Sequence, residues 1–165
     1  MAKTFLRAQK EIAEIYERHV KTLYRICFGY LKSQADAEDA VSDAFVRLIR
    51  SGKHFRDAEH EKAWLIRVSI NVCKDALKRR RRKEENLEDH LNLPAEESFE
   101  IDETLRVVMA LPDKYRTVIF LYYYEEYSSP EIAKLLQKPQ STIRSHLHEA
   151  RKLLKIQLGG DFYEG

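Results

Sequence analysis

One face of a helix expected over residues 62–82 carries residue types suited to binding nucleic acid. Placed at about 100° per residue, this face holds the only tryptophan with cationic and amide side chains: Trp64, Arg67, Asn71, Lys74 and Lys78. Single-stranded nucleic acid requires this mixture, because cations attract phosphates, a planar ring stacks on an unpaired base and an amide bonds a base edge. The basic run at residues 79–83 extends the charge, although cations near a helix C-terminus are favourable without any ligand. A second interpretation stays open, in which Trp64 folds into the core and the cations are merely solvated.

A second candidate face lies on the helix expected over residues 140–158. Its core side is apolar, with Ile143, Leu147, Ala150, Leu153 and Leu154. Its other side carries short polar residues followed or flanked by cations: Ser141, Ser145, His148, Lys152, Arg144, Arg151 and Lys155. This arrangement suits the second helix of a helix-turn-helix in the major groove of DNA, where arginine bonds guanine and lysines contact phosphates. An amphipathic surface helix of a three-helix core has the same pattern and remains an alternative.

Other combinations of polar residues do not form a site. His146 and His148 are two residues apart on a helix and point about 200° from each other, and no Cys/His cluster has zinc spacing. Neither a nucleophile–base arrangement nor a phosphate-binding loop occurs, so we expect no enzymatic activity, no metal and no cofactor. The absence of glycine from residues 53–158 disfavours a β-sandwich and a glycine-looped nucleotide site.

A group of carboxylates stands near the start of another expected helix: Asp36, Glu38, Asp39 and Asp43. The first two favour the positive end of the helix dipole. The others predict a charged face for a protein partner in preference to a metal site.

An all-α framework must position these faces, because apolar residues recur at spacings of three and four throughout the chain. The expected helices cover residues 12–31, 37–52, 62–82, 101–111, 113–126, 129–136 and 140–158. Ser33 is expected to cap the second helix, and Ser128 to Glu131 form a capping box with proline in the first turn. The buried side of the third helix is predicted to hold Leu65, Val68, Ser69, Val72, Cys73, Ala76 and Leu77. Residues 120–124 have strand propensity, but flanking charges at helical spacing favour a helix.

The formal net charge of +2 is unevenly distributed. Residues 1–83 carry 20 Lys and Arg against 11 Asp and Glu, residues 84–105 carry nine acids and no base, and residues 106–165 carry nine bases against seven acids. The acidic stretch contains Pro94 and only scattered apolar residues, which indicates a linker. We therefore expect two small helical domains, over residues 10–83 and 104–158, joined by an acidic flexible linker over residues 84–103. A solvated, self-repelling spacer would account for this linker without any active role.

The composition predicts a protein of the reducing cytoplasm. No run of about 18 apolar residues occurs, and the N-terminus lacks the apolar stretch of a secretory signal. The two cysteines, Cys27 and Cys73, lie inside apolar helical patterns, so no disulfide framework is indicated.

Three stretches carry a resemblance to a known family. The first is DAEDAVSDAF at residues 36–45, and the second is AWLIRVSINVCKD at residues 63–75. The third runs from LPDKYR at residues 111–116 through EIA at residues 131–133 to STIRS at residues 141–145. The three stretches occur in family order, and the resemblance covers nearly everything from about residue 11 to residue 156. The chain resembles a group IV, or extracytoplasmic-function (ECF), sigma factor, the dissociable promoter-recognition subunit of bacterial RNA polymerase.

The resemblance implies a role for each stretch. The first resembles the surface that docks on the clamp helices of the polymerase β′ subunit, which implies contacts from Asp36, Glu38, Asp39, Ser42, Asp43, Phe45 and Arg47. The second resembles the part that recognises and melts the −10 element, and residues 53–61 resemble the loop that captures a flipped base. This implies DNA contacts from His54, Phe55, Arg56, Lys62, Trp64, Arg67, Asn71, Lys74, Lys78, Arg79 and Arg80. The helix-turn-helix resembles the −35 reader, which also sits on the β flap, and implies contacts from Lys138, Gln140, Ser141, Thr142, Arg144, Ser145, His148, Arg151 and Lys152.

The partners implied by the resemblance are core RNA polymerase, promoter DNA that is duplex at −35 and partly single-stranded at −10, and an anti-sigma factor. The anti-sigma factor would cover the polymerase-binding surfaces and hold the protein at the membrane. The acidic linker corresponds to the segment that passes through polymerase toward the RNA exit path, where its charge would mimic RNA. No cofactor is implied.

Five positions depart from the family pattern. Ser42 stands where glutamine is frequent, Gln137 and Ser141 where glycines are usual, and His146 and Glu149 where arginines are common. These differences leave the expected fold unchanged, but the preferred −35 sequence does not follow from the resemblance.

Two other classes of protein fit parts of the pattern. One is a free-standing helix-turn-helix regulator with an N-terminal sensor or dimerising domain, and the other is an interaction module whose basic helix face docks an acidic partner. Trp64 on a cationic face favours the sigma factor over both. The low net charge agrees with a subunit whose halves bind DNA firmly only when polymerase holds both in place.

Overall fold

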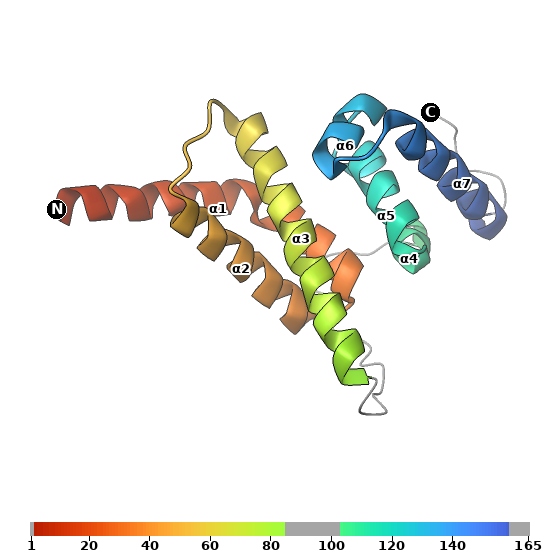
Figure 1. Cartoon of the computed structure of the whole chain (residues 1–165), viewed down its shortest axis with the longest axis horizontal. Coiled ribbons are helices and arrows are strands. Elements are labelled where there is room, and N and C mark those ends of the chain that lie inside the picture. The colour runs from red at the N-terminus through yellow and green to blue at the C-terminus, as the bar shows by residue number, and fades with distance from the viewer. Residues whose placement is uncertain (1, 85–102, 159–165) are drawn as a thin grey trace. The chain divides into compact units, whose positions relative to one another are not determined.

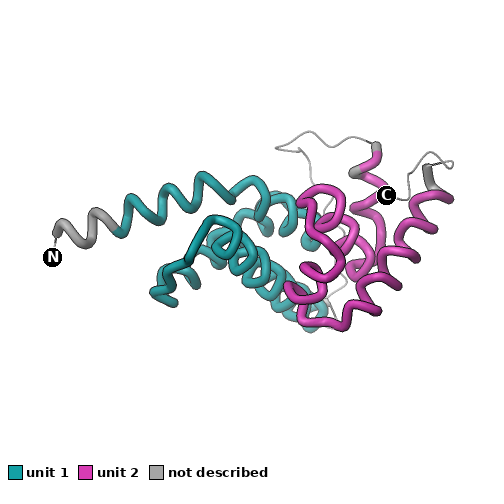
Figure 2. The backbone as a smooth tube through the Cα atoms, turned by 90° about the horizontal axis from the view of Figure 1, so that it is seen from above, with its two compact units in different colours: residues 1–96 teal, residues 97–165 magenta. Residues whose placement is uncertain are grey.

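The computed structural model describes residues 2–84 and 103–158, and every regular element in these two ranges is a helix. The chain divides into two compact units, residues 1–96 and 97–165 (Figure 2). Unit 1 contains α1 (Ala2–Leu31), α2 (Gln34–Ser51) and α3 (Ala58–Glu84). Unit 2 contains α4 (Glu103–Ala110), α5 (Asp113–Ile119), η1 (Phe120–Tyr124), α6 (Ser129–Leu136) and α7 (Gln140–Leu158) (Figure 1). The all-α prediction is confirmed, whereas the predicted linker lies, apart from its two ends, outside the described residues.

The helices of unit 1 pack pairwise around one apolar core (Figure 1). The largest fully buried side chains of this core come from α1 and α3: Leu23, Phe28, Leu31, Leu65 and Ile66. Each such side chain contributes about 1.5–3 kcal/mol when fully buried. The buried side of α2 is rich in alanine, at Ala37, Ala40 and Ala44, and small side chains allow neighbouring helices to approach closely.

Two turns fix the ends of α2. The Ser33 hydroxyl accepts a hydrogen bond from the Asp36 amide at 3.3 Å, which confirms the predicted cap. At the other end Gly52 has φ of 63°, a left-handed conformation that glycine adopts without the steric penalty of a side chain, and its amide bonds the Ile49 carbonyl.

The third helix begins earlier than predicted. It starts at Ala58, one turn before the expected Lys62, because the Asp57 carboxylate accepts a hydrogen bond from the His60 amide at 2.8 Å. An aspartate that satisfies an otherwise unpaired amide of the first turn is a favourable helix start.

The buried side of α3 is only partly as predicted. Leu65, Ser69, Val72 and Cys73 are buried, but Val68, Ala76 and Leu77 are half-buried. Ile66 and Ile70, which the prediction omitted, are 0% and 2% exposed. The observed buried side is about as broad as the predicted one but is rotated toward Ile66 and Ile70, in keeping with the packing of α3 against both α1 and α2.

Cys27 of α1 and Cys73 of α3 are free and buried, in agreement with the predicted lack of a disulfide. A hydrogen bond with Cys73 and burial raise the pKa of the Cys27 thiol. A thiol held in its neutral form is unreactive, so Cys27 acts as a packing group.

In unit 2, α7 packs against α4, α5 and α6. The predicted core side of α7 is confirmed for Ile143, Leu147, Ala150 and Leu154, which are at most 2% exposed, whereas Leu153 is half-buried. The capping box is confirmed: the Ser128 hydroxyl accepts from the Glu131 amide, and the Glu131 carboxylate accepts from the Ser128 amide.

The turn between α6 and α7 is closed by a residue other than glycine. Gln137 has φ of 56°, and its amide bonds the carbonyls of Ala133 and Lys134 at the end of α6. A left-handed conformation costs a residue with a side chain about 1–2 kcal/mol, which explains why glycine is usual at such a position.

The helix predicted over residues 113–126 is shorter and changes its winding. After α5 the chain continues as the π-helical turn η1 and leaves the helix at Tyr124. The rejection of a strand over residues 120–124 is therefore confirmed, but the wider turn was not predicted. Phe120 and Tyr124 stack with ring centroids 5.2 Å apart in this turn.

Candidate nucleic-acid interfaces

The predicted nucleic-acid face of α3 is open to solvent along the helix. Asn71, Lys74 and Lys78 are exposed, and Trp64 and Arg67 are half-buried. In the loop that precedes α3, His54 and Arg56 are exposed. The half-buried Lys62 completes the residues predicted at the start of the helix.

Trp64 belongs to an aromatic cluster (Lys53, Phe55, His60 and Trp64) between the loop and the first turns of α3. The rings of Trp64 and Phe55 have centroids 5.7 Å apart, and His60 meets Phe55 edge-on at 5.4 Å. Lys53 Nζ lies 5.9 Å from the centroid of the Trp64 ring, within cation–π range. Trp64 is thus neither in the bundle core nor isolated in solvent. Lys53 and His60 were not among the predicted site residues.

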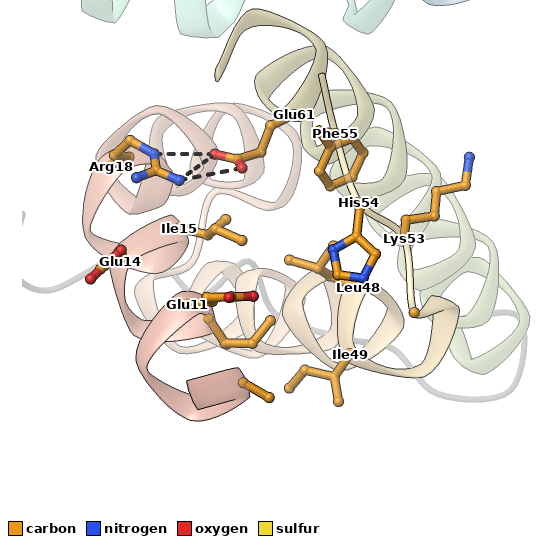
Figure 3. Close-up of a pocket in the computed structure, with 13 residues that line it drawn as sticks. Glu11, Glu14, Ile15, Arg18, Leu48, Ile49, Lys53, His54, Phe55 and Glu61 are labelled. Carbon is orange, nitrogen blue, oxygen red and sulfur yellow. Dashed lines mark hydrogen bonds and ion pairs between the residues drawn. The ribbon is translucent and has the colours of Figure 1, made fainter. Parts of the chain in front are cut away.

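A pocket of about 410 Å³ lies in unit 1, between α1, the end of α2 and the loop before α3 (Figure 3). Its walls combine aliphatic side chains, such as Ile15 and Leu48, with Arg18, Phe55 and Glu61. Apolar walls with a charged rim are typical of a pocket that side chains enclose on some sides and that is open to solvent on the others. The sequence did not predict this pocket.

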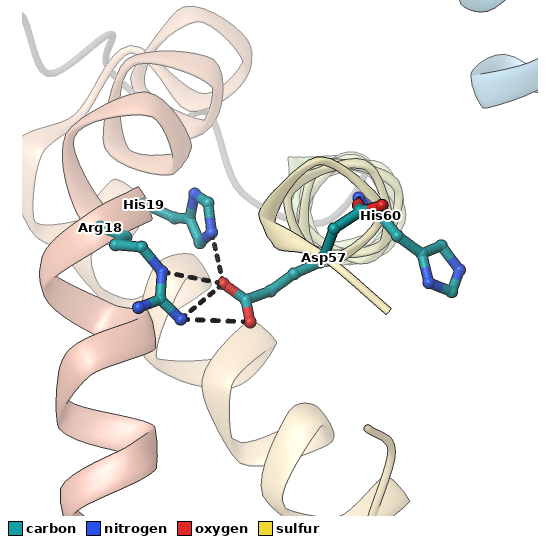
Figure 4. Close-up of polar contacts among 5 residues, drawn as sticks. Arg18, His19, Asp57 and His60 are labelled. Carbon is teal, nitrogen blue, oxygen red and sulfur yellow. Dashed lines mark hydrogen bonds and ion pairs between the residues drawn. The ribbon is translucent and has the colours of Figure 1, made fainter. Parts of the chain in front are cut away.

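An ionic cluster of Arg18, His19 and Glu61 joins α1 to the first turn of α3. Glu61 Oε1 accepts from His19 Nε2 at 2.7 Å, from Arg18 Nε at 3.2 Å and from Arg18 Nη2 at 3.0 Å (Figure 4). Arg18 Nη2 also donates to Glu61 Oε2 at 3.3 Å (Figure 3). Glu61 is 7% exposed and His19 6% exposed, so the bond between them is shielded from water, whereas the Arg18 side chain is 47% exposed and its charge-assisted bonds are partly open to solvent.

A signal for this ionic cluster was present in the sequence. Glu61 continues the buried stripe of Leu65 and Ser69 at the same spacing of four residues. An acid on the apolar side of a helix requires a partner, because a buried unpaired charge is very costly. Which residues supply that partner depends on the packing of α1, and the sequence alone did not reveal it.

The predicted polymerase-docking face lies on α2. Its exposed members are Glu38, Asp39, Ser42, Asp43 and Arg47. Arg47 Nη2 lies 3.8 Å from Asp75 Oδ2 of α3. Phe45, predicted on this face, is instead 6% exposed and packs on Tyr16 with ring centroids 5.0 Å apart. The Phe45 ring therefore supports α2 from the core and is not part of its surface.

Arg80, predicted on the DNA side of α3, makes structural contacts. It pairs with the Asp36 carboxylate and donates to the Leu31 carbonyl at 3.3 Å. These contacts satisfy the end of α1 and tie α3 to the turn between α1 and α2. The adjacent Arg79 is exposed.

The exposed side of α7, with the turn before it, carries most residues predicted to contact duplex DNA: Lys138, Gln140, Ser141, Arg144, Ser145, His148 and Lys152. Thr142 is half-buried. Arg151 is already engaged, because its Nε donates to the Tyr123 hydroxyl at 2.9 Å. Its guanidinium also lies over two aromatic rings, 5.3 Å from the centroid of Tyr122 and 5.8 Å from that of Tyr123. The two tyrosines were not predicted to support this site.

His146 turns away from the exposed side of α7. Its ring meets Tyr115 edge-on at 5.7 Å, and Lys114 Nζ lies 4.9 Å from the centroid of the Tyr115 ring. Burial, with the positive charges of Lys114 and Lys138, lowers the pKa of His146. Within residues 2–84 and 103–158, no three His, Cys, Asp or Glu side chains form a group that could hold a metal ion.

Comparison with known proteins identifies the family. The model of sigma-70 region 2 matches residues 15–83, and that of sigma-70 region 4 matches residues 101–154. The ECF RNA polymerase sigma factor SigM of Bacillus subtilis is 31% identical over 156 residues, which cover 87% of this chain and 93% of the relative. The chain belongs to the ECF sigma factors. SigW of the same organism is 28% identical over 168 residues, which cover 91% of this chain and 90% of the relative.

Solved structures show the same fold for this ECF sigma factor. The sigma factor RpoE of Bartonella quintana, in complex with the anti-sigma factor NepR, matches with a TM-score of 0.75 at 18% identity and covers 93% of this chain and 99% of RpoE. CnrH, in complex with the cytosolic domain of CnrY, matches with a TM-score of 0.66 at 23% identity and covers 93% and 91% of the two chains.

As an ECF sigma factor, the protein is a transcription initiation factor that directs promoter-specific transcription by RNA polymerase. The two family models divide it into region 2, which contains the aromatic cluster, and region 4, which contains α6 and α7. None of the helices in the described ranges has the length and apolar character needed to cross a membrane.

Proposed function

We propose that this ECF sigma factor recognises its promoter with two separate surfaces. Unit 1 binds the partly single-stranded −10 element, and unit 2 binds the duplex −35 element. The observation that carries the proposal is the position of Trp64, half-buried within the aromatic cluster at the head of the cationic face of α3. A core tryptophan would not present its ring to a ligand, and an isolated one would lack the support that orients it.

At the −10 element, the aromatic cluster offers ring faces on which an unpaired base stacks. Such stacking contributes about 1–3 kcal/mol per base. His54 and Arg56 in the adjacent loop are exposed and supply donors for the edge of a flipped base. Arg67, Lys74 and Lys78 follow along α3 as phosphate contacts, with Asn71 between them for a base edge.

At the −35 element, α6 and α7 form a helix-turn-helix whose second helix enters the major groove. Arg144 is exposed near the start of α7, and its guanidinium suits a two-pronged hydrogen bond to a guanine. Ser141, Ser145 and His148 lie on the same exposed side and suit shorter contacts to bases or phosphates. Lys138 and Lys152 suit phosphates.

Core polymerase is expected to dock on the exposed polar face of α2, defined by Glu38, Asp39, Ser42, Asp43 and Arg47, through the β′ clamp helices. Region 4 would sit on the β flap. The catalytic chemistry belongs to polymerase, so the sigma factor is not itself an enzyme. The matched RpoE is bound to an anti-sigma factor, which supports an anti-sigma factor that covers these surfaces here. The protein then works in the cytoplasm at the nucleoid, or waits at the membrane with the anti-sigma factor.

The charge distribution supports a subunit in preference to a solitary DNA binder. The excess of positive charge is concentrated in residues 1–83, whereas residues 106–165 carry nine bases against seven acids. Phosphate contacts supply most non-specific DNA affinity, so a nearly neutral region 4 binds weakly alone. Polymerase would hold the domains over residues 10–83 and 104–158 at a fixed separation. Their two DNA contacts, each weak alone, would then bind the promoter together with a much higher affinity. Residues 84–103 would thread toward the RNA exit path.

Transcription from a promoter library tests the proposal. The protein is mixed with core polymerase and templates randomised over both elements, and the transcripts are sequenced. We expect two enriched motifs at a fixed spacing, with Arg144→Ala altering the −35 motif alone. Failure to bind core polymerase, or enrichment of a single motif, would overturn the two-surface proposal.

A further inference from the structure

Glu61 occupies an unusual environment for a carboxylate in this protein. Among the residues that the structure describes, Glu61 is the only buried acid, at 7% exposure. It lies in the first turn of α3, and its carboxylate accepts hydrogen bonds from Arg18 and His19, both of which belong to α1. A buried charge is tolerated when paired partners and hydrogen bonds satisfy it, as they do here. This arrangement therefore fixes the start of α3 against α1.

The ionic cluster stands where apolar packing between these helices is thin. Further along, α1 and α3 meet through fully buried Leu23, Leu65 and Ile66. Beside Glu61 the space is instead the pocket of about 410 Å³, which Glu61 and Arg18 both line (Figure 3). Charged hydrogen bonds replace side-chain packing at this end of the bundle. Their loss would free the first turn of α3 and leave the rest of the helix in place.

The aromatic cluster depends on that first turn. Trp64 follows Glu61 by about one helical turn, and His60 comes directly before Glu61. Phe55, the ring between them, comes from the loop and lines the same pocket as Glu61. The loop begins at the left-handed Gly52 and reaches α3 at the Asp57 cap, without regular structure between. The direction of the first turn of α3 therefore determines where Trp64 and Phe55 stand.

We propose that Glu61 is a positioning residue for −10 recognition. Held by Arg18 and His19, it sets the first turn of α3 so that Trp64 and Phe55 present their rings to an unpaired base. Glu61 does not touch DNA in this scheme, since its carboxylate faces α1, whereas His60 lies on the opposite side of α3 (Figure 4). The inference rests on the proposed function of the aromatic cluster and adds the contact that orients it.

The single tryptophan makes the test direct, because its fluorescence reports only on this cluster. Glu61→Gln keeps the size of the side chain and removes its charge. We expect acrylamide to quench Trp64 about twice as efficiently in this variant. Holoenzyme affinity for an unpaired −10 oligonucleotide should fall roughly fivefold to tenfold, the equivalent of about one net hydrogen bond, because the amide that replaces the carboxylate can still accept from Arg18. Affinity for core polymerase and helical content by circular dichroism should stay at wild-type values.

Matched variants separate positioning from general stability. Glu59→Gln removes an exposed charge from the same turn and should leave quenching and oligonucleotide affinity unchanged. Arg18→Lys keeps the positive charge but loses the two-pronged contact, so its effect should be intermediate and remain measurable even if Glu61→Gln folds poorly. Equal quenching in Glu61→Gln and Glu59→Gln, or a lowered unfolding temperature with unchanged oligonucleotide affinity, would overturn the positioning role.

A further variant distinguishes failure of this inference from failure of the proposed function. If Trp64→Ala weakens oligonucleotide binding but Glu61→Gln does not, the aromatic cluster binds DNA and Glu61 does not position it. If Trp64→Ala has no effect, the proposed −10 surface is wrong, and Glu61 loses the role proposed for it as well.

Discussion

The two candidate DNA surfaces are built in opposite ways. On unit 1, Trp64 is held by Phe55 and Lys53, and the turn that carries it is fixed to α1 by the ionic cluster. On unit 2, Arg144, Ser145, His148 and Lys152 are exposed along α7, and Arg151 is held by Tyr122 and Tyr123. The first surface is organised before any ligand binds, whereas the second is a set of separate side chains on a rigid helix.

This difference matches the two forms of DNA. A duplex is itself rigid, so a straight helix with independent side chains suffices to reach base edges in its groove. A single strand is flexible, and its bases must be ordered when they bind, so the protein has to supply a rigid stacking surface. Substitutions in the aromatic cluster should therefore act together, and those on α7 should act separately.

The largest effect is expected for Trp64→Ala. Loss of one stacking contact costs about 1–3 kcal/mol, so the rate of open-complex formation should fall roughly 10-fold to 100-fold. Trp64→Phe retains a ring and should recover most of this loss. Open complexes are measured by permanganate reactivity of unpaired thymines, alongside core polymerase binding. If Trp64→Ala also abolishes core binding, Trp64 acts as a packing residue and the contrast between the surfaces disappears.

Arg144→Ala should have a more local effect, confined to one base pair of the −35 element. Loss of a two-pronged contact to guanine costs about 1–3 kcal/mol and relaxes specificity at one base pair, and the neighbouring contacts on α7 remain in place. Holoenzyme binding to promoters with each base at every −35 position provides the measurement. Lys152→Ala is the control, because loss of a phosphate contact should weaken all sequences equally and lower the salt dependence by about one ion. Loss of preference at several positions in Arg144→Ala would mean that α7 is organised as a unit.

Tyr123→Phe tests the support that Tyr123 gives to Arg151 of α7. The substitution removes the hydroxyl that accepts from Arg151 and leaves the ring beneath the guanidinium. The loss of one net hydrogen bond, about 1 kcal/mol, corresponds to roughly a fivefold decrease in −35 binding. A double-mutant cycle with Arg151→Ala isolates the contact, and the Tyr123 effect should vanish in that background. An undiminished effect there would show that Tyr123 acts independently of Arg151.

The sequence predicted the framework better than the contacts. Helix starts at Ser33 and Ser128 and the apolar side of α7 followed from local capping and spacing, which depend on neighbours in the chain. The contacts of Phe45 with Tyr16 and of Arg80 with Leu31 and Asp36 were not predicted, because these partners lie in α1 and at the start of α2, distant in sequence. The same reason hid the partners of Glu61. Residue type and spacing identify a face, but packing between helices decides which of its members remain free to bind.

The smallest effect concerns His146, which should make the stability of unit 2 depend on pH without affecting unit 1. Burial and the charges of Lys114 and Lys138 lower the pKa of His146 in the folded state from its ordinary 6.5. The Tyr115 ring also contacts the His146 ring. At pH values below 6.5 and above the lowered pKa, His146 binds a proton more readily in the unfolded chain than in the folded one. Stability of unit 2 is therefore complete above about pH 6.5 and decreases as the pH falls through the lowered pKa.

His146→Gln should flatten this decrease in thermal unfolding followed by tyrosine near-ultraviolet circular dichroism, while the fluorescence of Trp64 in unit 1 stays unchanged. His148→Gln, an exposed control two residues away, should keep the wild-type profile. If both variants flatten the profile alike, loss of any histidine from α7 produces the effect, and the crowding of His146 by Lys114 and Lys138 is not its cause.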